Sequence, residues 1–138
     1  MLTYIIFCIN KYEKKYSNNV KVMNDKPFVE RFTHEERLHE SRQIMKKYRS
    51  SAPVIVEPKD ENTLKIDKTK FLVPWDLTYG QFLYIVRKRL KINPHEAIFM
   101  FCNGTLPSSQ DTIHNIYQKY GKSDGFLYFI YAFENTFG

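Results

Sequence analysis

The sequence has little of the chemistry on which most enzymes and secreted proteins depend. Only two of its 138 residues are cysteines, Cys8 and Cys102, and they form no CxxC pair. Two isolated cysteines give no disulfide framework, which favours a reducing compartment. The four histidines are His34, His39, His95 and His114. Their spacing fits no metal-ligand motif, and no glycine-rich phosphate loop is present, so the sequence predicts neither a metal nor a cofactor.

The sequence also lacks an apolar run that could cross a bilayer near its start. Residues 2–9 are apolar, but a membrane-spanning helix needs about 20 such residues. The run has neither the basic start nor the small-residue cleavage site of a signal peptide. We therefore expect a cytoplasmic protein.

Positive charge is in modest excess, with a formal net charge of +6. Residues 1–22 hold four lysines against one glutamate, and residues 10–26 have no sustained hydrophobic period. We predict that residues 1–26 are a disordered leader and that residues 27–138 are one folded domain. Two interpretations of the leader stay open. Either Met23 is the true first residue, or the apolar patch and its lysines assist membrane contact.

The strongest positive signal is the stretch at residues 126–133, which reads Phe-Leu-Tyr-Phe-Ile-Tyr-Ala-Phe. It contains no proline, glycine or charge. Such a short apolar run is typical of a strand covered on both faces, at the centre of a small sheet. Polar residues and Gly138 follow it, which predicts a short solvated tail.

Two helices have clear start signals. Thr33 and Glu36 form a capping box that opens the first helix, which residues 50–53 are predicted to end. Thr78 and Gln81 form a second capping box. The apolar residues of this second helix recur at helical spacing and indicate a buried face: Phe82, Ile85, Val86 and Leu90.

Strands are predicted at residues 54–56, 71–73 and 97–102, and the first two are expected to form a hairpin. Residues 103–104, Asn-Gly, indicate a tight turn after the third. Asp111 is predicted to cap a third, short helix. The order strand, strand, helix, strand, strand, short helix, strand is typical of an α+β, ubiquitin-like β-grasp. Its mixed sheet has four to five strands, and at least one extra helix precedes it.

Several segments closely resemble the autophagy-related protein 8 family. They are Lys-Thr-Lys-Phe-Leu-Val-Pro at 68–74, Asp-Leu-Thr at 76–78, Gly-Gln-Phe at 80–82, Arg-Lys-Arg at 87–89 and Asp-Gly-Phe-Leu-Tyr at 124–128. The similarity runs in consistent order from about Phe28 to the end. It implies two N-terminal helices before the β-grasp core. Because the chain ends on Gly138, it most resembles the plant-type subset that needs no processing before conjugation.

The resemblance implies a ubiquitin-like modifier rather than an enzyme, joined through Gly138 to the amine of phosphatidylethanolamine. It would act in autophagosome formation and in recruiting cargo receptors. The implied partners are the activating and conjugating enzymes of the autophagy conjugation system, the receptors, the phosphatidylethanolamine membrane, and a cysteine protease for delipidation. The implied locations are the autophagosome membrane when lipidated and the vacuole or lysosome on delivery.

The resemblance also implies a peptide-binding groove along residues 70–73, an open sheet edge to which an aromatic-x-x-aliphatic motif adds as a strand. The implied aromatic pocket uses Glu40, Ile44, Pro53, Ile55, Lys68, Lys70, Leu72 and Phe126. The implied aliphatic pocket uses Phe71, Val73, Pro74, Leu77, Phe82, Ile85 and Arg89. A possible second docking surface comprises Ile98, Phe99 and Met100. Trp75 departs from the family pattern and is expected to widen or obstruct the aliphatic pocket, or to sit exposed beside the edge strand.

The residues alone leave other interpretations open. Four apolar residues of the groove could simply be core: Ile44, Ile55, Leu72 and Phe82. Lys68 and Lys70 could be ordinary solvated charges. Cys102 lies in an apolar alternation, which favours a buried thiol over a nucleophile. A non-conjugated adaptor or trafficking protein would keep the groove and make Gly138 incidental, whereas nucleic-acid binding through residues 87–89 is a minor alternative, so we expect no nucleic-acid partner.

Overall fold

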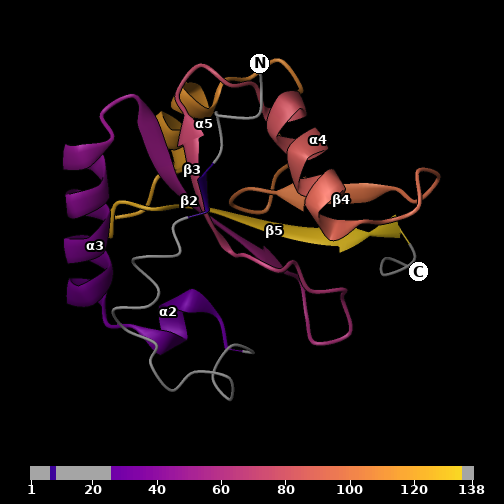
Figure 1. Ribbon diagram of the computed structural model, residues 1–138, viewed down its shortest axis with the longest axis horizontal. Helices are drawn as coiled ribbons and strands as arrows, with labels where there is room; N and C mark the ends of the chain where they lie inside the picture. The colour runs from indigo at the N-terminus through magenta and orange to yellow at the C-terminus, as the bar shows by residue number, and fades with distance from the viewer. Residues whose placement is uncertain (1–6, 9–25, 135–138) are drawn as a thin grey trace.

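Five strands form one mixed sheet at the centre of this computed structural model, which describes residues 7–8 and 26–134. The strands are β1 Phe7–Cys8, β2 Ser51–Pro58, β3 Lys70–Pro74, β4 Ile98–Phe101 and β5 Leu127–Phe133. Their order across the sheet is β1-β3-β2-β5-β4 (Figure 1). Only β2 and β5 pair in parallel, and the other three pairings are antiparallel. The last strand thus lies inside the sheet, as the sequence predicts.

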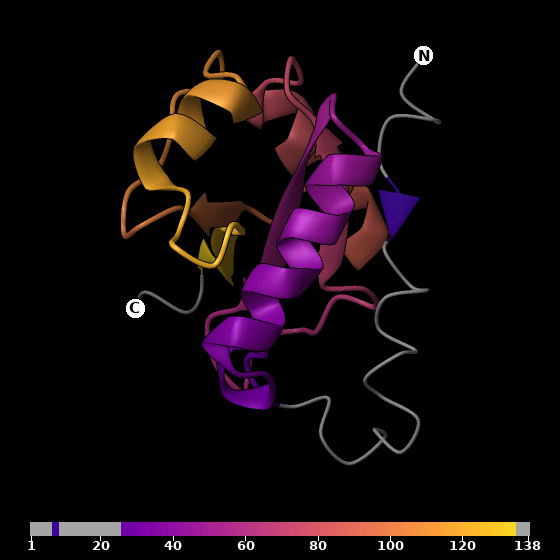
Figure 2. The ribbon, with the colours of Figure 1, turned by 90° about the vertical axis from the view of Figure 1, so that its left-hand side faces the viewer.

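Four helices surround the sheet in the described part of the chain. They are α2 Phe28–Arg31, α3 His34–Lys47, α4 Tyr79–Leu90 and α5 Ile113–Tyr120. Figures 1 and 2 show α3 along one side of the sheet, and α4 and α5 lie away from α3. Two helices precede β2, and α4 packs across the mixed sheet. The predicted α+β, ubiquitin-like β-grasp with two N-terminal helices is therefore confirmed.

Both predicted capping boxes are present. The Thr33 hydroxyl accepts the N–H of Glu36 at 3.1 Å, and the Glu36 carboxylate accepts the N–H of Thr33 at 2.8 Å. Thr78 and Gln81 exchange the same pair of hydrogen bonds. These reciprocal bonds satisfy N–H groups that a helix start leaves without an intrahelical partner, which is why α3 and α4 begin where they do.

Two local predictions are wrong. The N-cap of α5 is Thr112 rather than Asp111, because the Thr112 hydroxyl is the group that accepts a helical N–H, that of Asn115 at 3.1 Å. β2 also extends well beyond the predicted residues 54–56. Pro53 is tolerated inside it because pairing with β5 begins only at Val54, so the missing N–H of Pro53 breaks no ladder bond.

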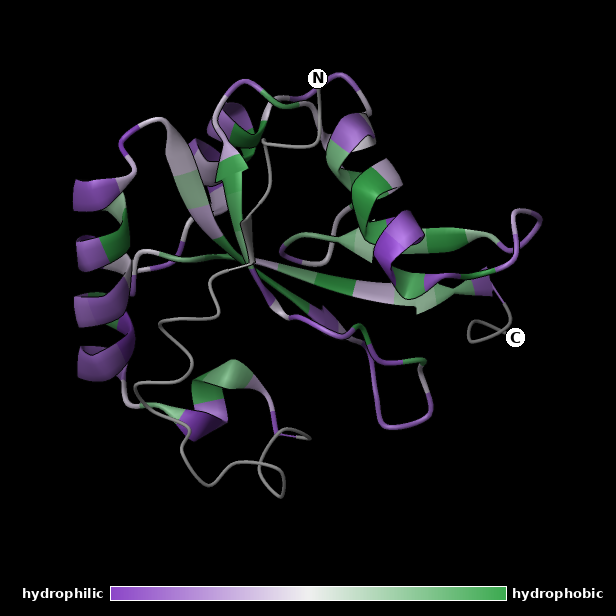
Figure 3. Cartoon of the chain, viewed as in Figure 1, coloured by the Kyte–Doolittle hydropathy of each residue, from purple (hydrophilic) through white to green (hydrophobic). Residues whose placement is uncertain are grey.

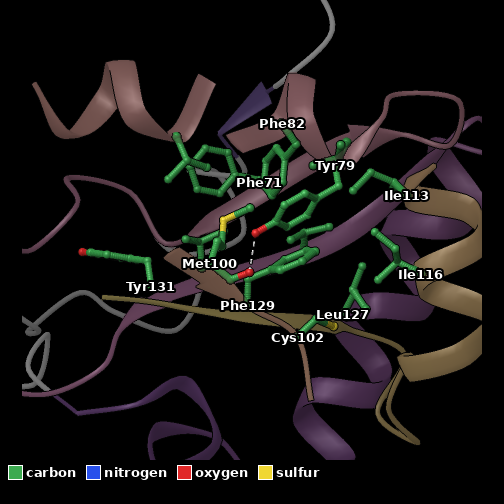
Figure 4. Close-up of a cluster of buried hydrophobic side chains, with 14 of the residues drawn as sticks. Phe71, Tyr79, Phe82, Met100, Cys102, Ile113, Ile116, Leu127, Phe129 and Tyr131 are labelled. Carbon is green, nitrogen blue, oxygen red and sulfur yellow. Dashed lines mark hydrogen bonds between the residues drawn. The ribbon is translucent and has the colours of Figure 1, made fainter. Parts of the chain in front are cut away.

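Side chains alternate across the sheet, so neighbouring residues enter different hydrophobic clusters. Leu72 joins what we call the α3 cluster: Phe28, Ile44, Ile55, Leu72 and Phe126. Phe71 and Val73 join the larger main core, which also takes in α4 and α5 (Figure 4). Figure 3 shows hydrophobic colour along the strands, whereas most of α3 is hydrophilic. A largely polar helix therefore covers one cluster, and the main core lies on the other face of the sheet.

The leader contributes one strand, although the sequence predicts that it is disordered. Phe7 and Cys8 form β1, which lies beside β3 (Figure 2). The prediction for the remaining leader residues, 1–6 and 9–25, lies outside the described residues. So does the prediction for Gly138, because the description ends at Glu134.

Candidate functional site

The outer edge of β3 is the backbone on which the implied peptide would add. The N–H of Val56 donates to the carbonyl of Thr69 at 2.8 Å, and the N–H of Trp75 donates to the carbonyl of Ser50 at 3.0 Å. Both bonds join β2 to odd-numbered residues of the β3 segment. Hydrogen-bonding residues alternate along an antiparallel strand, so Leu72 directs its N–H and carbonyl away from β2.

That outward position is occupied. Phe7 is the antiparallel partner of Leu72, and Cys8 is the partner of Phe71. The expectation of an open edge along residues 70–73 is therefore wrong for Phe71 and Leu72, which have a strand on both sides. The sequence could not show this, because the paired residues lie more than sixty positions apart and β1 is only two residues long.

The residues of the implied aromatic pocket do come together, but in a closed state. Ile44, Ile55 and Phe126 have no exposed surface, and Leu72 is 2% exposed. Pro53 is buried, and Lys68 is half-buried. The interpretation of Ile44, Ile55 and Leu72 as core residues thus describes this structure.

Phe28 completes this cluster and was missed by sequence reasoning. Its ring lies 5.0 Å from that of Phe126 and 5.2 Å from that of Phe32, in tilted to edge-on contacts that aromatic pairs prefer. The available signal was its position, since Phe28 follows Pro27 at the start of the domain and is the first residue of α2. A short helix with one buried aromatic residue has no periodicity to reveal it.

Lys70 and Glu40 form a buried ion pair beside these rings. The Lys70 Nζ lies 2.9 Å from the Glu40 Oε1, and the two side chains are only 1% and 3% exposed. The ammonium also lies 5.0 Å from the centre of the Phe28 ring and 5.4 Å from that of Phe32, within cation–π range. The interpretation of Lys70 as a solvated charge is therefore wrong, because the ammonium is held by a carboxylate and two ring faces.

The implied aliphatic pocket has a buried floor and an accessible rim. Phe71, Val73 and Phe82 are fully buried in the main core, and Leu77 is nearly so. The rings of Phe71 and Phe82 meet edge to face at 5.7 Å (Figure 4). The half-buried rim residues are Pro74, Ile85 and Arg89.

Arg89 gives this rim its charge. Its guanidinium lies 5.8 Å from the centre of the Phe71 ring and 3.3 Å from the Asp67 carboxylate. The Asp67 side chain is largely exposed, so this ion pair is weak and can exchange for a carboxylate on a ligand.

Trp75 is half-buried and turned toward α5. Its indole N–H donates to the Arg49 carbonyl at 2.9 Å, and its ring meets those of His114 and Tyr117 edge to face, at 5.4 and 5.1 Å. With Asp76, Thr112 and Gln118, these rings line an open hollow of about 660 Å³. None of these lining residues belongs to the implied aliphatic pocket, and the effect of Trp75 on that pocket stays a prediction.

The possible second docking surface lies on β4. Ile98 and Met100 are buried, and only Phe99 is half-exposed. The carbonyl of Met100 accepts the hydroxyl of Tyr79 at 2.6 Å. Two of the three residues thus support the core, and whether Phe99 contributes to docking stays a prediction.

Cys102 is buried in the main core, where burial raises the pKa of its thiol to about 11. A thiol of this kind is a poor nucleophile at neutral pH. Within residues 7–8 and 26–134, no group of three His, Cys, Asp or Glu side chains could hold a metal ion. A search of the same residues finds no helix long and apolar enough to cross a membrane.

Comparisons with known proteins agree with this architecture. A family model described as "Autophagy protein Atg8 ubiquitin like" matches residues 36–138. Autophagy-related protein 8 of Schizosaccharomyces pombe is 46% identical over 112 residues, covering 80% of this chain and 93% of that protein. Autophagy-related protein 8A of Oryza sativa subsp. indica is 50% identical over 105 residues, covering 75% and 88%.

A solved structure supports the same assignment. The crystal structure of Trypanosoma brucei ATG8 superposes with a TM-score of 0.74 at 34% sequence identity, covering 80% of this chain and 96% of that one. The family match therefore covers strands β2 to β5, the main core and Gly138, whereas β1 and Phe28 lie outside it. The chain belongs to the Atg8 family of ubiquitin-like autophagy proteins.

Proposed function

We propose that the chain is a modifier, not an enzyme, that becomes joined through Gly138 to phosphatidylethanolamine and then captures cargo receptors along β3. The observation that carries the proposal is the extent of the family match, which continues through β3 and β5 to Gly138. The protein would be cytoplasmic when free, on the autophagosome membrane when lipidated, and in the vacuole or lysosome after delivery.

Conjugation requires a carboxylate that can enter the active sites of other enzymes. An activating enzyme would join the Gly138 carboxylate to AMP from ATP, with release of pyrophosphate, and the cysteine thiol of that enzyme would then displace AMP to form a thioester. After transfer to a conjugating enzyme, the lipid amine would displace the thiol to form an amide. Five residues, of which Gly138 is the last, follow Phe133 at the end of β5. Fully extended, such a segment spans at most about 17 Å, which supports reach beyond the domain.

Receptor capture uses the two faces of β3. A peptide strand added along this edge would direct its aromatic residue toward the α3 cluster and its aliphatic residue toward the rim beside Ile85, because side chains of a strand alternate. Lys68 and Arg89 near the groove favour acidic residues that flank the motif. We expect affinity of order micromolar, about −8 kcal/mol.

Reconstitution tests the conjugation. The full chain is incubated with the activating and conjugating enzymes, ATP and liposomes that contain phosphatidylethanolamine. We expect a lipid-linked band that disappears without ATP, in Gly138→Ala and after treatment with the delipidating protease. If the unmodified chain gives no such band, the non-conjugated adaptor becomes the better description.

Titration with an aromatic-x-x-aliphatic peptide tests the groove separately. Ile85→Ala removes apolar surface from the rim and should weaken binding about tenfold. Tyr84→Ala is the matched control, because Tyr84 is on the same helix but 52% exposed and outside both pockets. Equal affinities for the two variants would remove the aliphatic pocket from the proposal.

A further inference from the structure

The edge where the proposed peptide would add already has an occupant from the same chain. We propose that β1, Phe7–Cys8, is an internal competitor that closes the groove and must leave β3 before a receptor peptide can bind. This inference rests on the proposed receptor capture, but its hydrogen-exchange measurement does not. It makes the leader a regulator of access to the groove.

Backbone geometry makes the competition direct. Leu72 directs its N–H and carbonyl to the outer side of β3, and Phe7 is the residue opposite it. In an antiparallel ladder, a pair placed in this way exchanges both of its hydrogen bonds. An added peptide strand needs the same two groups of Leu72, so β1 and the peptide cannot both be in place.

Burial around the groove agrees with a closed state. Leu72 and Phe126, which the aromatic residue of a peptide would have to contact, are 2% and 0% exposed. The Lys70 ammonium beside them is enclosed by Glu40, Phe28 and Phe32. An aromatic side chain therefore cannot reach these residues unless the cluster rearranges, and binding requires that change together with the release of β1.

The short length of β1 sets the strength of the effect. A two-residue strand makes few backbone hydrogen bonds, each of modest net value, so it can be displaced. Because it belongs to the same chain, its local concentration does not fall on dilution, whereas a peptide must compete through its own concentration. The apparent affinity of the peptide is reduced by the fraction of molecules in which the edge is free.

A proline substitution at position 7 tests the competition, because it should favour the state in which the β3 edge is free over the state in which β1 is paired with β3. Phe7→Pro removes the N–H that faces Leu72 and cannot take part in the ladder. Asn18→Pro is the matched control, since it adds a proline to the leader outside β1. Both are made in the full chain, and thermal unfolding confirms that each is folded. We expect Phe7→Pro to bind an aromatic-x-x-aliphatic peptide about tenfold more tightly than the wild type, and Asn18→Pro to be unchanged.

Hydrogen exchange of the Leu72 amide provides the measurement that needs no peptide. We expect protection in the wild type and in Asn18→Pro, and faster exchange in Phe7→Pro. An unprotected Leu72 amide in the wild type would overturn the inference, as would equal peptide affinities for the two variants. Protection that disappears on dilution would also overturn it, because the strand would then come from a second copy of the chain.

Failure of the proposed function has a different signature. If no variant binds the peptide, receptor capture is wrong. Protection of Leu72 that depends on Phe7 would then still show that the leader covers this edge. If peptide binds wild type and Phe7→Pro equally well, receptor capture stands and the internal competition is wrong.

Discussion

The two sides of β3 are held together by different means. On one side, Phe71 and Val73 enter a main core that holds 20 of the described residues and joins α4, α5 and four strands of the sheet. On the other side, Leu72 enters an α3 cluster of five buried residues. Most of α3 is polar, and Ile44 is its only buried hydrophobic residue, so α3 contributes little apolar surface to this cluster.

Polar contacts also hold α3 against the rest of the domain. Lys70 pairs with Glu40 of α3 at 2.9 Å, and Arg37 of α3 pairs with Asp124 at 2.9 Å. The Ser41 hydroxyl also donates to the Asp124 carbonyl at 2.5 Å. The comparison indicates that the α3 side can open while the main core stays intact, since local opening follows the regions with the least apolar burial. We therefore expect the α3 side of β3 to admit the aromatic residue of a peptide more easily than the main-core side.

The largest expected effect concerns the main core. Phe82→Ala should lower the free energy of unfolding by about 4 kcal/mol, because it empties a fully buried position in contact with Phe71 and Phe129. Urea unfolding measures the change, and half-buried Ile85→Ala, at about 1 kcal/mol, is the control on the same helix. If Phe82→Ala weakened peptide binding with no loss of stability, the floor of the aliphatic pocket would not be part of the core.

The sequence predicts the framework well because its signals are local. Thr33 and Thr78 start helices through bonds to residues three positions away. The assignment of Lys70 and Leu72 to one pocket and of Phe71 and Val73 to the other comes from the family resemblance. The closed state of the groove could not be predicted in this way. Phe7 meets Leu72, and Lys70 meets Glu40, only through the fold. Neither a two-residue strand nor a lone lysine has a sequence periodicity from which its partner could be predicted.

The second prediction concerns the buried ion pair. Glu40→Gln should lower the free energy of unfolding by about 3 kcal/mol, because it removes the buried carboxylate that pairs with the Lys70 ammonium at 2.9 Å. The double variant Glu40→Leu with Lys70→Met should recover most of the loss, since two apolar residues need no pairing. Asp67→Asn, which removes an exposed ion pair with Arg89, should change stability by less than about 0.5 kcal/mol. Equal losses for Glu40→Gln and Asp67→Asn would contradict the assigned role of burial.

A third prediction compares the two sides within the wild type. The amide of Ile44 in α3 should exchange through local opening, at a free energy at least about 2 kcal/mol below that of Phe129 in β5. Native-state hydrogen exchange in low urea distinguishes the two routes, because local opening exposes little surface and responds weakly to urea. The same free energy and the same urea dependence at both sites would show that the α3 side and the main core open together.

The smallest expected effect concerns the carboxyl group that anchors α2. Glu57 accepts the N–H of Phe28 at 2.7 Å, and burial raises the pKa of Glu57 above 4.5, more than this hydrogen bond lowers it. A carboxyl group with a raised pKa in the folded state binds its proton more tightly there. It therefore stabilises the fold in acid, and this contribution is lost as pH rises from about 4.5 through the folded pKa.

Glu57→Gln should keep the acceptor for Phe28 without the charge. We expect its free energy of unfolding at pH 7 to exceed that of the wild type by a few tenths of a kcal/mol, with the difference shrinking toward pH 4. Glu61→Gln is the control, because Glu61 is exposed. If the free energies of unfolding of the wild type and Glu57→Gln had the same dependence on pH, the Glu57 charge would not affect the packing of α2 and Phe28 on the α3 cluster. The contrast between the two sides of β3 would then depend on the Lys70–Glu40 pair and on α3 alone.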